Sequence, residues 1–187
     1  LGESGIDADL DAWLADGEPP AYFGFGSMPV TDPSAALGMI CQVTDRLGLR
    51  ALVSAGWSRM TGGSDDSTRV RVVAALNHDV VMARCRLAVH HGGAGTTAAS
   101  VSAGIPTVVC SVFADQPFWG VRLEGLGAGA HLRFSKLSSS LLEEGLRRAL
   151  RAEVGARANE LGAALRLETD AANRAAEMVE KVSANGR

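Results

Sequence analysis

A run of eight residues, HHGGAGTT at positions 90–97, carries residue types suited to binding an anion. It follows the apolar stretch 87–90 and leads into the small residues of 98–104, which indicates a strand, a glycine turn and a helix start. Free backbone N–H groups at a helix start attract phosphate, and the glycines of this turn let it approach the backbone closely. The helix end contributes only about 0.3–1 kcal/mol, whereas a micromolar ligand needs about 8 kcal/mol. We therefore expect the side chains of His91 and Thr96 to add hydrogen bonds to phosphate oxygens.

A metal-binding interpretation of the two histidines is excluded by strand geometry. Successive residues of a strand point to opposite faces, so His90 and His91 cannot both reach one ion. Because His91 adjoins the turn, we expect it to face the ligand and His90 to be structural. The D-x-D sequence at 7–9 precedes the apolar segment 10–14, where acidic residues favour a helix start, and is interpreted as a helix cap. The sequence predicts no metal site.

A dinucleotide site is the main alternative for the glycine turn, and tight helix–strand packing without a ligand is another. Residues 93–98 fit the pattern G-x-G-x-x-G/A, and Asp115 follows Gly95 by 20 residues, as the acidic residue of such a site would. However, that fingerprint belongs to the first strand–helix turn of its domain. Here three predicted strands precede the strand that leads into the turn, and too few follow it to build a second nucleotide-binding half. We therefore disfavour an NAD site.

Apolar runs alternate with segments of helical spacing along the chain. Runs at 21–26, 50–55, 70–75, 87–90 and 107–112 predict five buried strands, and 129–132 adds a possible sixth. Helical spacing is seen at Ala35, Met39, Val43 and Leu47, and again at 121–126. Helices are also expected at 141–150, 153–167 and 171–182, and a loop of turn composition at 56–69. This alternation predicts an α/β protein with a doubly wound parallel sheet and a helical C-terminal tail.

Composition narrows the class of protein. The 187 residues are 47% hydrophobic and carry a net charge of -3, which predicts one globular domain without a basic face for nucleic acid. The three cysteines are far apart in apolar runs and are expected to be reduced. No stretch approaches the ~18 apolar residues of a membrane span, and nothing is typical of a signal peptide, so a cytoplasmic protein is expected. Residues 1–20 have the composition of a linker with a short helix, and 21–187 are expected to form the domain.

The glycine turn, the segment GIP at 104–106 and the segment DQPFW at 115–119 together resemble nucleotide-sugar glycosyltransferases of the sterol, macrolide and glycopeptide type. The segments YFGFGSM at 22–28, GW at 56–57 and LNH at 76–78 are similar to that family too, in the expected order. The resemblance extends from Ile6 to about Val182. It implies a GT-B fold, in which two Rossmann-like domains face each other across a cleft. This chain matches the C-terminal, donor-binding domain as a three-layer Rossmann-like unit, and the N-terminal acceptor domain is absent from it.

The resemblance also implies roles for individual residues. Asp115 and Gln116 match the pair that hydrogen-bonds sugar hydroxyls, whereas the nucleoside would lie against Trp57, Leu76 and Asn77. The plant-type pattern places a tryptophan nearer Leu76 to stack on uracil, so the donor could be a UDP-sugar or a TDP-sugar. The residues expected to hold the diphosphate are Ser27, His91, Gly93, Ala94, Gly95 and Thr96.

The implied reaction is transfer of a hexose with inversion, in which a base removes the proton of the acceptor hydroxyl as the diphosphate departs. The family's base lies in the N-terminal domain, so no catalytic residue is expected in this chain, and the resemblance implies no required metal or other cofactor. Neither His78 nor His131 has an acid–base partner that can be recognised in the sequence. The chain alone is expected to bind donor but hardly to transfer sugar. A natural donor-binding subunit of a two-chain transferase is the alternative.

Overall fold

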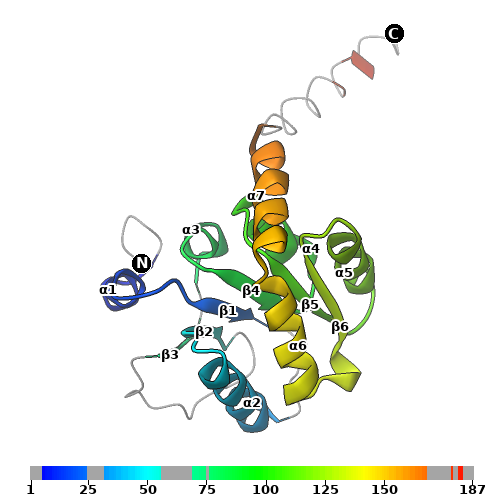
Figure 1. Ribbon diagram of the computed structural model, residues 1–187. Coiled ribbons are helices and arrows are strands. Elements are labelled where there is room, and N and C mark those ends of the chain that lie inside the picture. Colours follow the sequence, from blue (N-terminus) through cyan, green and yellow to red (C-terminus); the bar gives the residue numbers. More distant parts are fainter. Residues whose placement is uncertain are drawn as a thin grey trace.

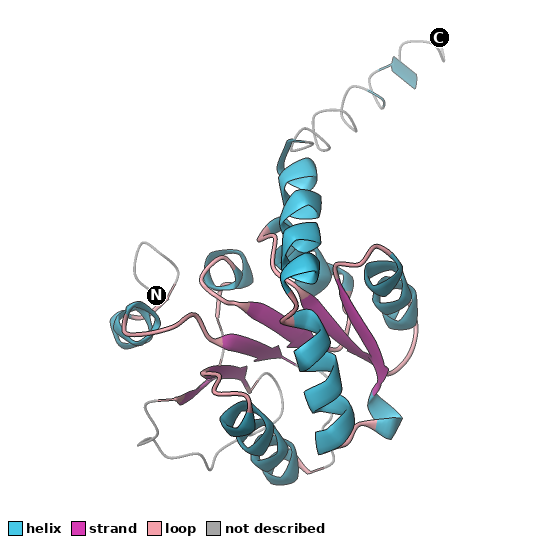
Figure 2. Ribbon diagram, viewed as in Figure 1, coloured by secondary structure: helices cyan, strands magenta, loops and turns pink. Residues whose placement is uncertain are grey.

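The computed structural model describes residues 6–24, 32–55, 69–74 and 76–167, together with residues 178, 181 and 182 of the tail. Its centre is a six-stranded sheet in which all neighbouring strands are parallel, in the order β3-β2-β1-β4-β5-β6 (Figures 1 and 2). The predicted doubly wound α/β fold is confirmed, including the sixth strand. The strands are β1 (Ala21–Gly24), β2 (Ala51–Ser54), β3 (Val70–Val73), β4 (Leu87–His90), β5 (Thr107–Ser111) and β6 (Gly129–Arg133).

Helices cover both faces of this sheet. The second and sixth helices lie on one face, and the others pack on the opposite face or at its edge (Figure 1). Right-handed crossovers produce this arrangement, because the crossovers that run in opposite directions along the sheet, on the two sides of the point where the strand order reverses, cover opposite faces. The helices are α1 (Ala8–Ala15), α2 (Pro33–Arg46), α3 (His78–Met82), α4 (Ala94–Ser102), α5 (Gln116–Gly125), α6 (Ser139–Ala149) and α7 (Ala152–Leu167), with a 3-10 turn at Phe134–Lys136.

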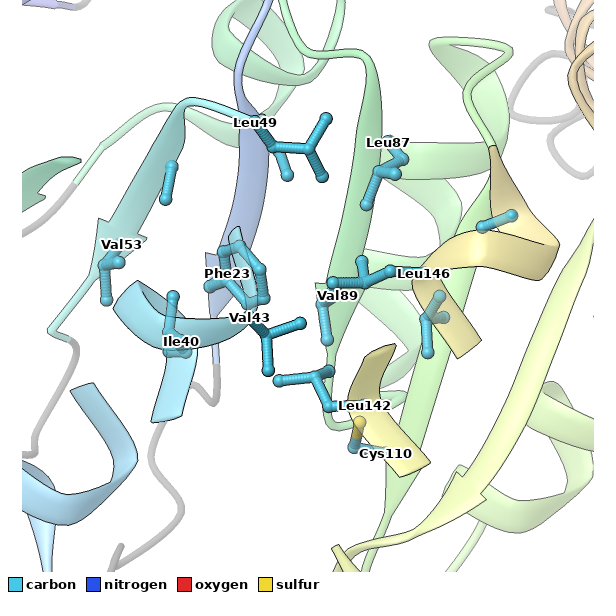
Figure 3. Packing of buried hydrophobic residues seen from close by; sticks show 14 of the residues in the cluster. Phe23, Ile40, Val43, Leu49, Val53, Leu87, Val89, Cys110, Leu142 and Leu146 are labelled. Atoms are coloured by element: carbon cyan, nitrogen blue, oxygen red, sulfur yellow. The ribbon is translucent and has the colours of Figure 1, made fainter. Parts of the chain in front are cut away.

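The core is divided by the pleat of the strands. Phe23 of β1 and Val89 of β4 point into the layer formed with Ile40 of α2 and Leu142 of α6 (Figure 3). The neighbouring residue Tyr22 points to the other face, as strand alternation requires, and joins the cluster beneath α1 and α3. Both layers are apolar, which is expected for central parallel strands buried on two sides.

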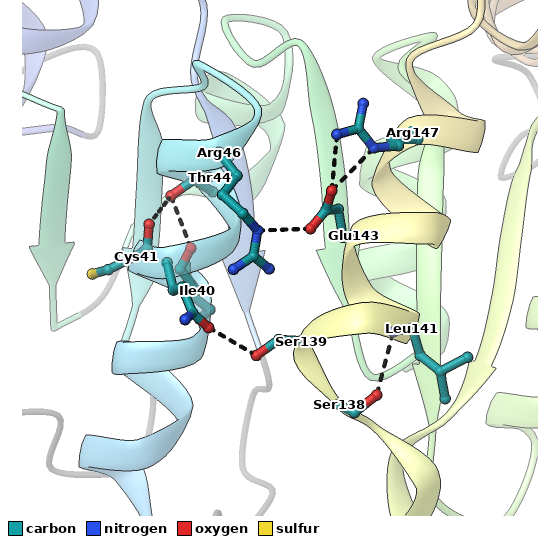
Figure 4. A network of polar contacts seen from close by, with 10 residues as sticks. Ile40, Cys41, Thr44, Arg46, Ser138, Ser139, Leu141, Glu143 and Arg147 are labelled. Atoms are coloured by element: carbon teal, nitrogen blue, oxygen red, sulfur yellow. Dashed lines mark hydrogen bonds and ion pairs between the residues drawn. The ribbon is translucent and has the colours of Figure 1, made fainter.

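Polar contacts on the outer side connect α2 with α6 (Figure 4). The Nε atom of Arg46 donates to Oε2 of Glu143 at 2.7 Å, and the other carboxylate oxygen of Glu143 accepts from Arg147. The hydroxyl of Ser139 donates to the side-chain oxygen of Gln42 at 3.1 Å. Because these groups are exposed to water, the polar pairs add little to stability, and the contact between α2 and α6 depends mainly on apolar packing.

The start of α1 confirms the capping interpretation of the D-x-D sequence. Asp7 is the N-cap, and its Oδ1 accepts from the backbone N–H of Leu10 at 2.7 Å. The buried residues Ile6, Leu10 and Leu14 pack α1 against the domain. Helix α1 is therefore packed against the rest of the domain. The assignment of residues 1–20 as a linker stays a prediction.

Three details of the expected elements were wrong. The strand near residue 70 is half-buried rather than buried, because β3 lies at the edge of the sheet. In α2 the face toward the core begins at Leu37 and Ile40, whereas Ala35 is exposed. In α5 only Leu123 of the apolar positions at 121–126 is buried, and Val121 is 58% exposed. Helical spacing identified the helices, but the packing partner decided which face was covered.

The C-terminal helices and the cysteines agree with the predictions where the structure describes them. Helices α6 and α7 lie where they were predicted, and Met178, Lys181 and Val182 are helical, whereas the rest of 171–182 lies outside the described residues. Cys41, Cys85 and Cys110 are all free thiols, and burial raises the pKa of each. In the described part of the chain, no helix has the length and hydropathy needed to cross a membrane.

Candidate functional site

The candidate site lies at the carboxyl edge of the sheet, between β1 and β4. The chain passes from β1 to β2 and β3 on one side, and from β4 to β5 and β6 on the other. The connections on the two sides of this boundary leave in opposite directions, which opens a crevice where ligands of doubly wound proteins bind. The glycine turn, residues 91–96, follows β4 directly and therefore lies at this boundary.

Two glycines of the turn are required by its geometry. Gly92 has φ +90°, and a Cβ atom there would lie 2.6 Å from Cγ1 of Val109 and 3.1 Å from the carbonyl oxygen of Gln116. A Cβ atom on Gly93 would lie 2.5 Å from Nε2 of His91. A larger residue at either position would therefore displace the strand neighbour or the imidazole ring.

The start of α4 leaves its backbone donors open. Gly93 is the N-cap and makes no side-chain capping hydrogen bond. The N–H groups of Ala94, Gly95 and Thr96 belong to the first turn, where a helix supplies no acceptor for them. No described atom lies within 4 Å of a Cβ atom placed on Gly95, so packing within the described chain does not require glycine there. These donors and the positive end of the helix dipole are suited to an anion.

His90 supports the turn from the buried side through a hydrogen bond with Gly92. Its side chain is completely buried, its Nδ1 accepts from the N–H of Gly92 at 3.0 Å, and its Nε2 lies 3.4 Å from the hydroxyl of Ser100. Burial, with smaller contributions from His91 and His78, lowers the pKa of His90 to about 3, so the ring is neutral at pH 7. His90 thus has the structural environment that was expected for one of the two histidines.

His91 lies on the other side of the strand end and is half-buried. Its Nδ1 atom is buried and has no hydrogen-bond partner among the described residues. Burial lowers the pKa of His91, and the backbone of Gly24 and the carboxylate of Asp115 oppose this effect. Gly24 of β1, Gly93 of the turn and Asp115 after β5 therefore all lie close to this ring.

The β5–α5 loop, residues 112–116, is built differently. Gln116 is buried, and its Oε1 accepts from the N–H groups of Val112 at 2.9 Å and Phe113 at 3.2 Å. Ala114 has φ +56°, an uncommon conformation for a residue with a Cβ atom. The exposed Asp115 accepts from Nε1 of Trp119 at 2.9 Å. The loop packs against the glycine turn at Gln116 and Gly92, so both segments face one site.

The residues expected near the nucleoside are only partly described. Leu76 is half-buried against the second core cluster, and Asn77 is the N-cap of α3, where its Oδ1 accepts from the N–H of Asp79 at 3.1 Å. Both lie before α3, beside β1. Ser27 and Trp57 lie outside the described residues.

Two histidines have partners that the sequence did not reveal. The Nε2 atom of His78 lies 2.9 Å from the hydroxyl of the buried Tyr22, and Nε2 of His131 lies 2.7 Å from the hydroxyl of Ser111. Burial lowers the pKa of both histidines and raises the pKa of Tyr22. The partners are 56 and 20 residues apart, so no local pattern could have indicated either pair.

The topology also weakens the dinucleotide alternative. The glycine turn follows the fourth strand of the sheet, and β1 lies beside that strand. The dinucleotide fingerprint instead belongs to the turn after the first strand. In the part of the chain that the structure describes, no group of three or more His, Cys, Asp or Glu side chains could hold a metal ion.

Comparison with known proteins gives one family. The model of the family described as "Erythromycin biosynthesis protein CIII-like, C-terminal domain" matches residues 63–185. An uncharacterized glycosyltransferase of Mycobacterium leprae is 39% identical over 180 residues, which are 96% of this chain and 42% of that protein. A sterol 3-beta-glucosyltransferase of Arabidopsis thaliana is 39% identical over 122 residues, which are 65% of this chain and 19% of that protein. The chain thus spans less than half the length of these curated relatives.

Solved structures agree in fold. The glycotransferase of kitacinnamycin superposes with a TM-score of 0.75 at 21% identity, over 89% of this chain and 43% of that one. The glycosyltransferase VinC in complex with dTDP has a TM-score of 0.64 at 19% identity, over 80% and 38% of the two chains. The expected resemblance to the C-terminal half of GT-B glycosyltransferases is confirmed. Because the family model covers well over half of the sequence, the chain belongs to the family of erythromycin biosynthesis protein CIII-like C-terminal domains.

Proposed function

We propose that this chain binds the donor of an inverting glycosyltransferase that moves a hexose from a UDP- or TDP-sugar to a hydroxyl of a small or lipophilic acceptor. The observation that carries the proposal is the open start of α4 at the boundary between β1 and β4, beside a half-buried His91. Relatives named as glycosyltransferases and a structural neighbour in complex with dTDP support the same assignment.

The diphosphate would lie on the glycine turn. The backbone N–H groups at Gly93, Ala94, Gly95 and Thr96 would donate to its oxygens, since a helix start favours negative charge. His91 would add a hydrogen bond, since its half-buried ring lies beside Gly93 of the turn. Gly95 leaves room for the ligand, since no described atom lies where its Cβ atom would be. Ser27 stays a predicted contact at the β1 side.

The sugar would lie on the β5–α5 loop. Asp115 is fixed through one carboxylate oxygen by Trp119, and its other oxygen could accept from a sugar hydroxyl. The Oε1 atom of Gln116 is engaged by two backbone donors, so a contact of Gln116 with the sugar would use the amide nitrogen. The nucleoside would extend toward Leu76 and Asn77, and Trp57, outside the described residues, stays a predicted contact.

In the proposed reaction, negative charge develops on the β-phosphate as the bond to the anomeric carbon breaks. Donors that are already oriented at the start of α4 would stabilise that charge without the help of a divalent ion. The base that deprotonates the acceptor would come from an acceptor-binding domain outside this chain. We therefore expect this chain to bind donor without catalysing efficient transfer. Its location in the cytoplasm stays a prediction.

The proposal is tested by calorimetric titration of the chain with UDP, TDP, UDP-glucose, TDP-glucose and NAD in the presence of EDTA. Saturable binding of UDP or TDP and of the matching sugar nucleotide is expected. The nucleotide that binds more tightly identifies the nucleobase, uracil or thymine, that the site prefers. The absence of binding by all of the UDP and TDP ligands, or binding of NAD alone, would contradict the proposed function. Rapid sugar transfer to an added acceptor by this chain would contradict the assignment of the base to another domain.

A further inference from the structure

His131 touches the polypeptide on both sides of the β5–α5 loop. The residue before the loop is Ser111, the last residue of β5, whose hydroxyl lies 2.7 Å from Nε2 of His131. In the strand register His131 is paired with Val109, so its ring reaches Ser111 diagonally along the same face of the sheet. Ser111 is only 5% exposed, which shields this contact from competing water.

The second contact is with the helix that follows the loop. A Cβ atom on Gly120 of α5 would lie 2.4 Å from Cδ2 and 2.9 Å from Cγ of His131. The imidazole ring therefore lies directly against the helix backbone. The side chain of His131 on β6 thus contacts both the end of β5 and the first turns of α5.

The loop between these two contacts needs external support. Ala114 is held at φ +56°, a strained conformation that persists only where the surroundings impose it. Gln116 supplies one constraint by accepting from Val112 and Phe113. The contacts of His131 with Ser111 and Gly120 supply the other, because they fix the two ends of the loop relative to each other.

Burial favours the neutral form of the His131 ring, and the charged groups nearby act in both directions. Burial lowers the pKa of His131, the carboxylate of Glu124 on α5 opposes this, and Arg133 on its own strand reinforces it. Arg148 of α6 binds Glu124 at 2.6 Å and partly neutralises that carboxylate. Nε2 of a neutral ring can accept a hydrogen bond from the Ser111 hydroxyl or donate one to its oxygen, so the contact persists in either tautomer.

We infer that His131 is a positioning residue for recognition of the donor sugar, which acts through Ser111 and Gly120 to hold Asp115 in place. The inference rests on the proposed function, because it assigns the sugar to the β5–α5 loop. A positioning role predicts different effects on the two ends of the donor, whereas a general structural role predicts the same effect on both. Loss of the Ser111–His131 contact should disturb the sugar end of the donor and leave the diphosphate end, which is held by the glycine turn, unaffected.

The test compares His131→Phe and Ser111→Ala with the wild-type chain. Phenylalanine keeps a ring against Gly120 but removes the hydrogen bond. Dissociation constants are measured for UDP-glucose and TDP-glucose, and for UDP and TDP. Loss of one hydrogen bond predicts about three- to tenfold weaker binding of the sugar nucleotide in each variant. Binding of the free nucleotide diphosphate should stay within about twofold.

Two further variants separate positioning from general damage. His131→Gln retains a group that can hydrogen-bond Ser111 and should recover most of the lost affinity. The double variant Ser111→Ala with His131→Phe should lose no more than either single variant, since both remove the same contact. Tyr22→Phe is the matched control, because it deletes the other hydroxyl–histidine pair and should leave the ratio of the two affinities unchanged.

Equal losses for the sugar nucleotide and the free nucleotide, or no loss for either, would overturn the inference while leaving the proposed function intact. Failure of the wild-type chain to bind any of the four ligands would instead remove the proposed function, and the inference with it.

Discussion

The glycine turn and the β5–α5 loop occupy equivalent places in the fold but are built from different groups. Each follows a central parallel strand and precedes a helix at the same edge of the sheet. In the glycine turn, the N–H groups that open α4 have no side-chain cap. The start of α5 likewise has no side-chain cap, but in the β5–α5 loop the side chain of Gln116 accepts from the N–H groups of Val112 and Phe113, and Asp115 adds a carboxylate. Open backbone donors suit phosphate, whereas a carboxylate repels phosphate and accepts from hydroxyls, so side chains decide which ligand group each segment suits.

The largest expected effect concerns the contact between the two segments. Gly92→Ala would force an L-residue to φ +90° and place its Cβ atom 2.6 Å from Val109. Strain of about 1–3 kcal/mol and overpacking of about 1–3 kcal/mol together predict a free energy of unfolding lower by roughly 2–6 kcal/mol. Urea denaturation measures this difference. A change below about 0.5 kcal/mol would show that the turn and the loop are not rigidly packed.

His91→Ala tests the phosphate end. Loss of a hydrogen bond to a charged oxygen predicts that UDP and UDP-glucose both bind about 1.5–3 kcal/mol more weakly. Calorimetry on the two ligands checks the prediction, and the thermal midpoint of the unliganded variant serves as its control. A loss confined to UDP-glucose would move His91 from the diphosphate to the sugar.

Acidification tests how His90 holds the turn. Its pKa is about 3 in the folded chain and about 6.5 when unfolded, so below pH 6.5 the unfolded chain binds a proton that the folded chain does not. Stability is therefore lost as the pH falls, by about 2 kcal/mol between pH 7 and pH 5 from this residue. Burial lowers the pKa of His78, His91 and His131 as well, which acts in the same direction. Urea titrations at the two pH values measure the change, and equal stability at both would contradict the buried, neutral state.

Asp115→Ala tests the sugar end. UDP-glucose should bind about 1–3 kcal/mol more weakly, whereas free UDP should be almost unaffected, because the diphosphate does not depend on this carboxylate. Asp115→Asn keeps an acceptor for the sugar hydroxyl and is expected to lose less. Similar losses of affinity for both ligands in the alanine variant would contradict the assignment of the diphosphate to the turn and of the sugar to the loop.

The smallest expected effect is that of Gly95→Ala, which should change stability and UDP binding in opposite directions. Gly95 lies in the first turn of α4 without a described atom near its Cβ position, so Gly95→Ala should stabilise the fold by up to about 1 kcal/mol. The same methyl group would occupy the approach of the phosphate and weaken UDP binding. Gly155→Ala in α7, which also has open space, is the matched control and should stabilise without a loss of binding. Unchanged UDP affinity in Gly95→Ala would place the phosphate away from this residue.

The order of strands and helices could be predicted from the sequence, because burial on two faces imposes apolar runs and helices impose their own spacing. The turn at 91–96 could likewise be predicted to follow a strand and open a helix, since three glycines and a histidine are local features. Capping of α1 by Asp7 was predictable for the same reason, as the bond spans only three residues.

Contacts between groups far apart in the sequence could not be predicted in this way. The Tyr22–His78 and Ser111–His131 pairs, the packing of Gly92 against Gln116 and the exposure of Val121 all depend on how separate elements are juxtaposed. Gln116 shows this difference within one residue: its sequence context suggested a sugar contact, and the folded chain engages its Oε1 with the backbone of its own loop. Residue type and spacing fix what a side chain can bind, whereas the packing of elements far apart in sequence fixes what lies within its reach.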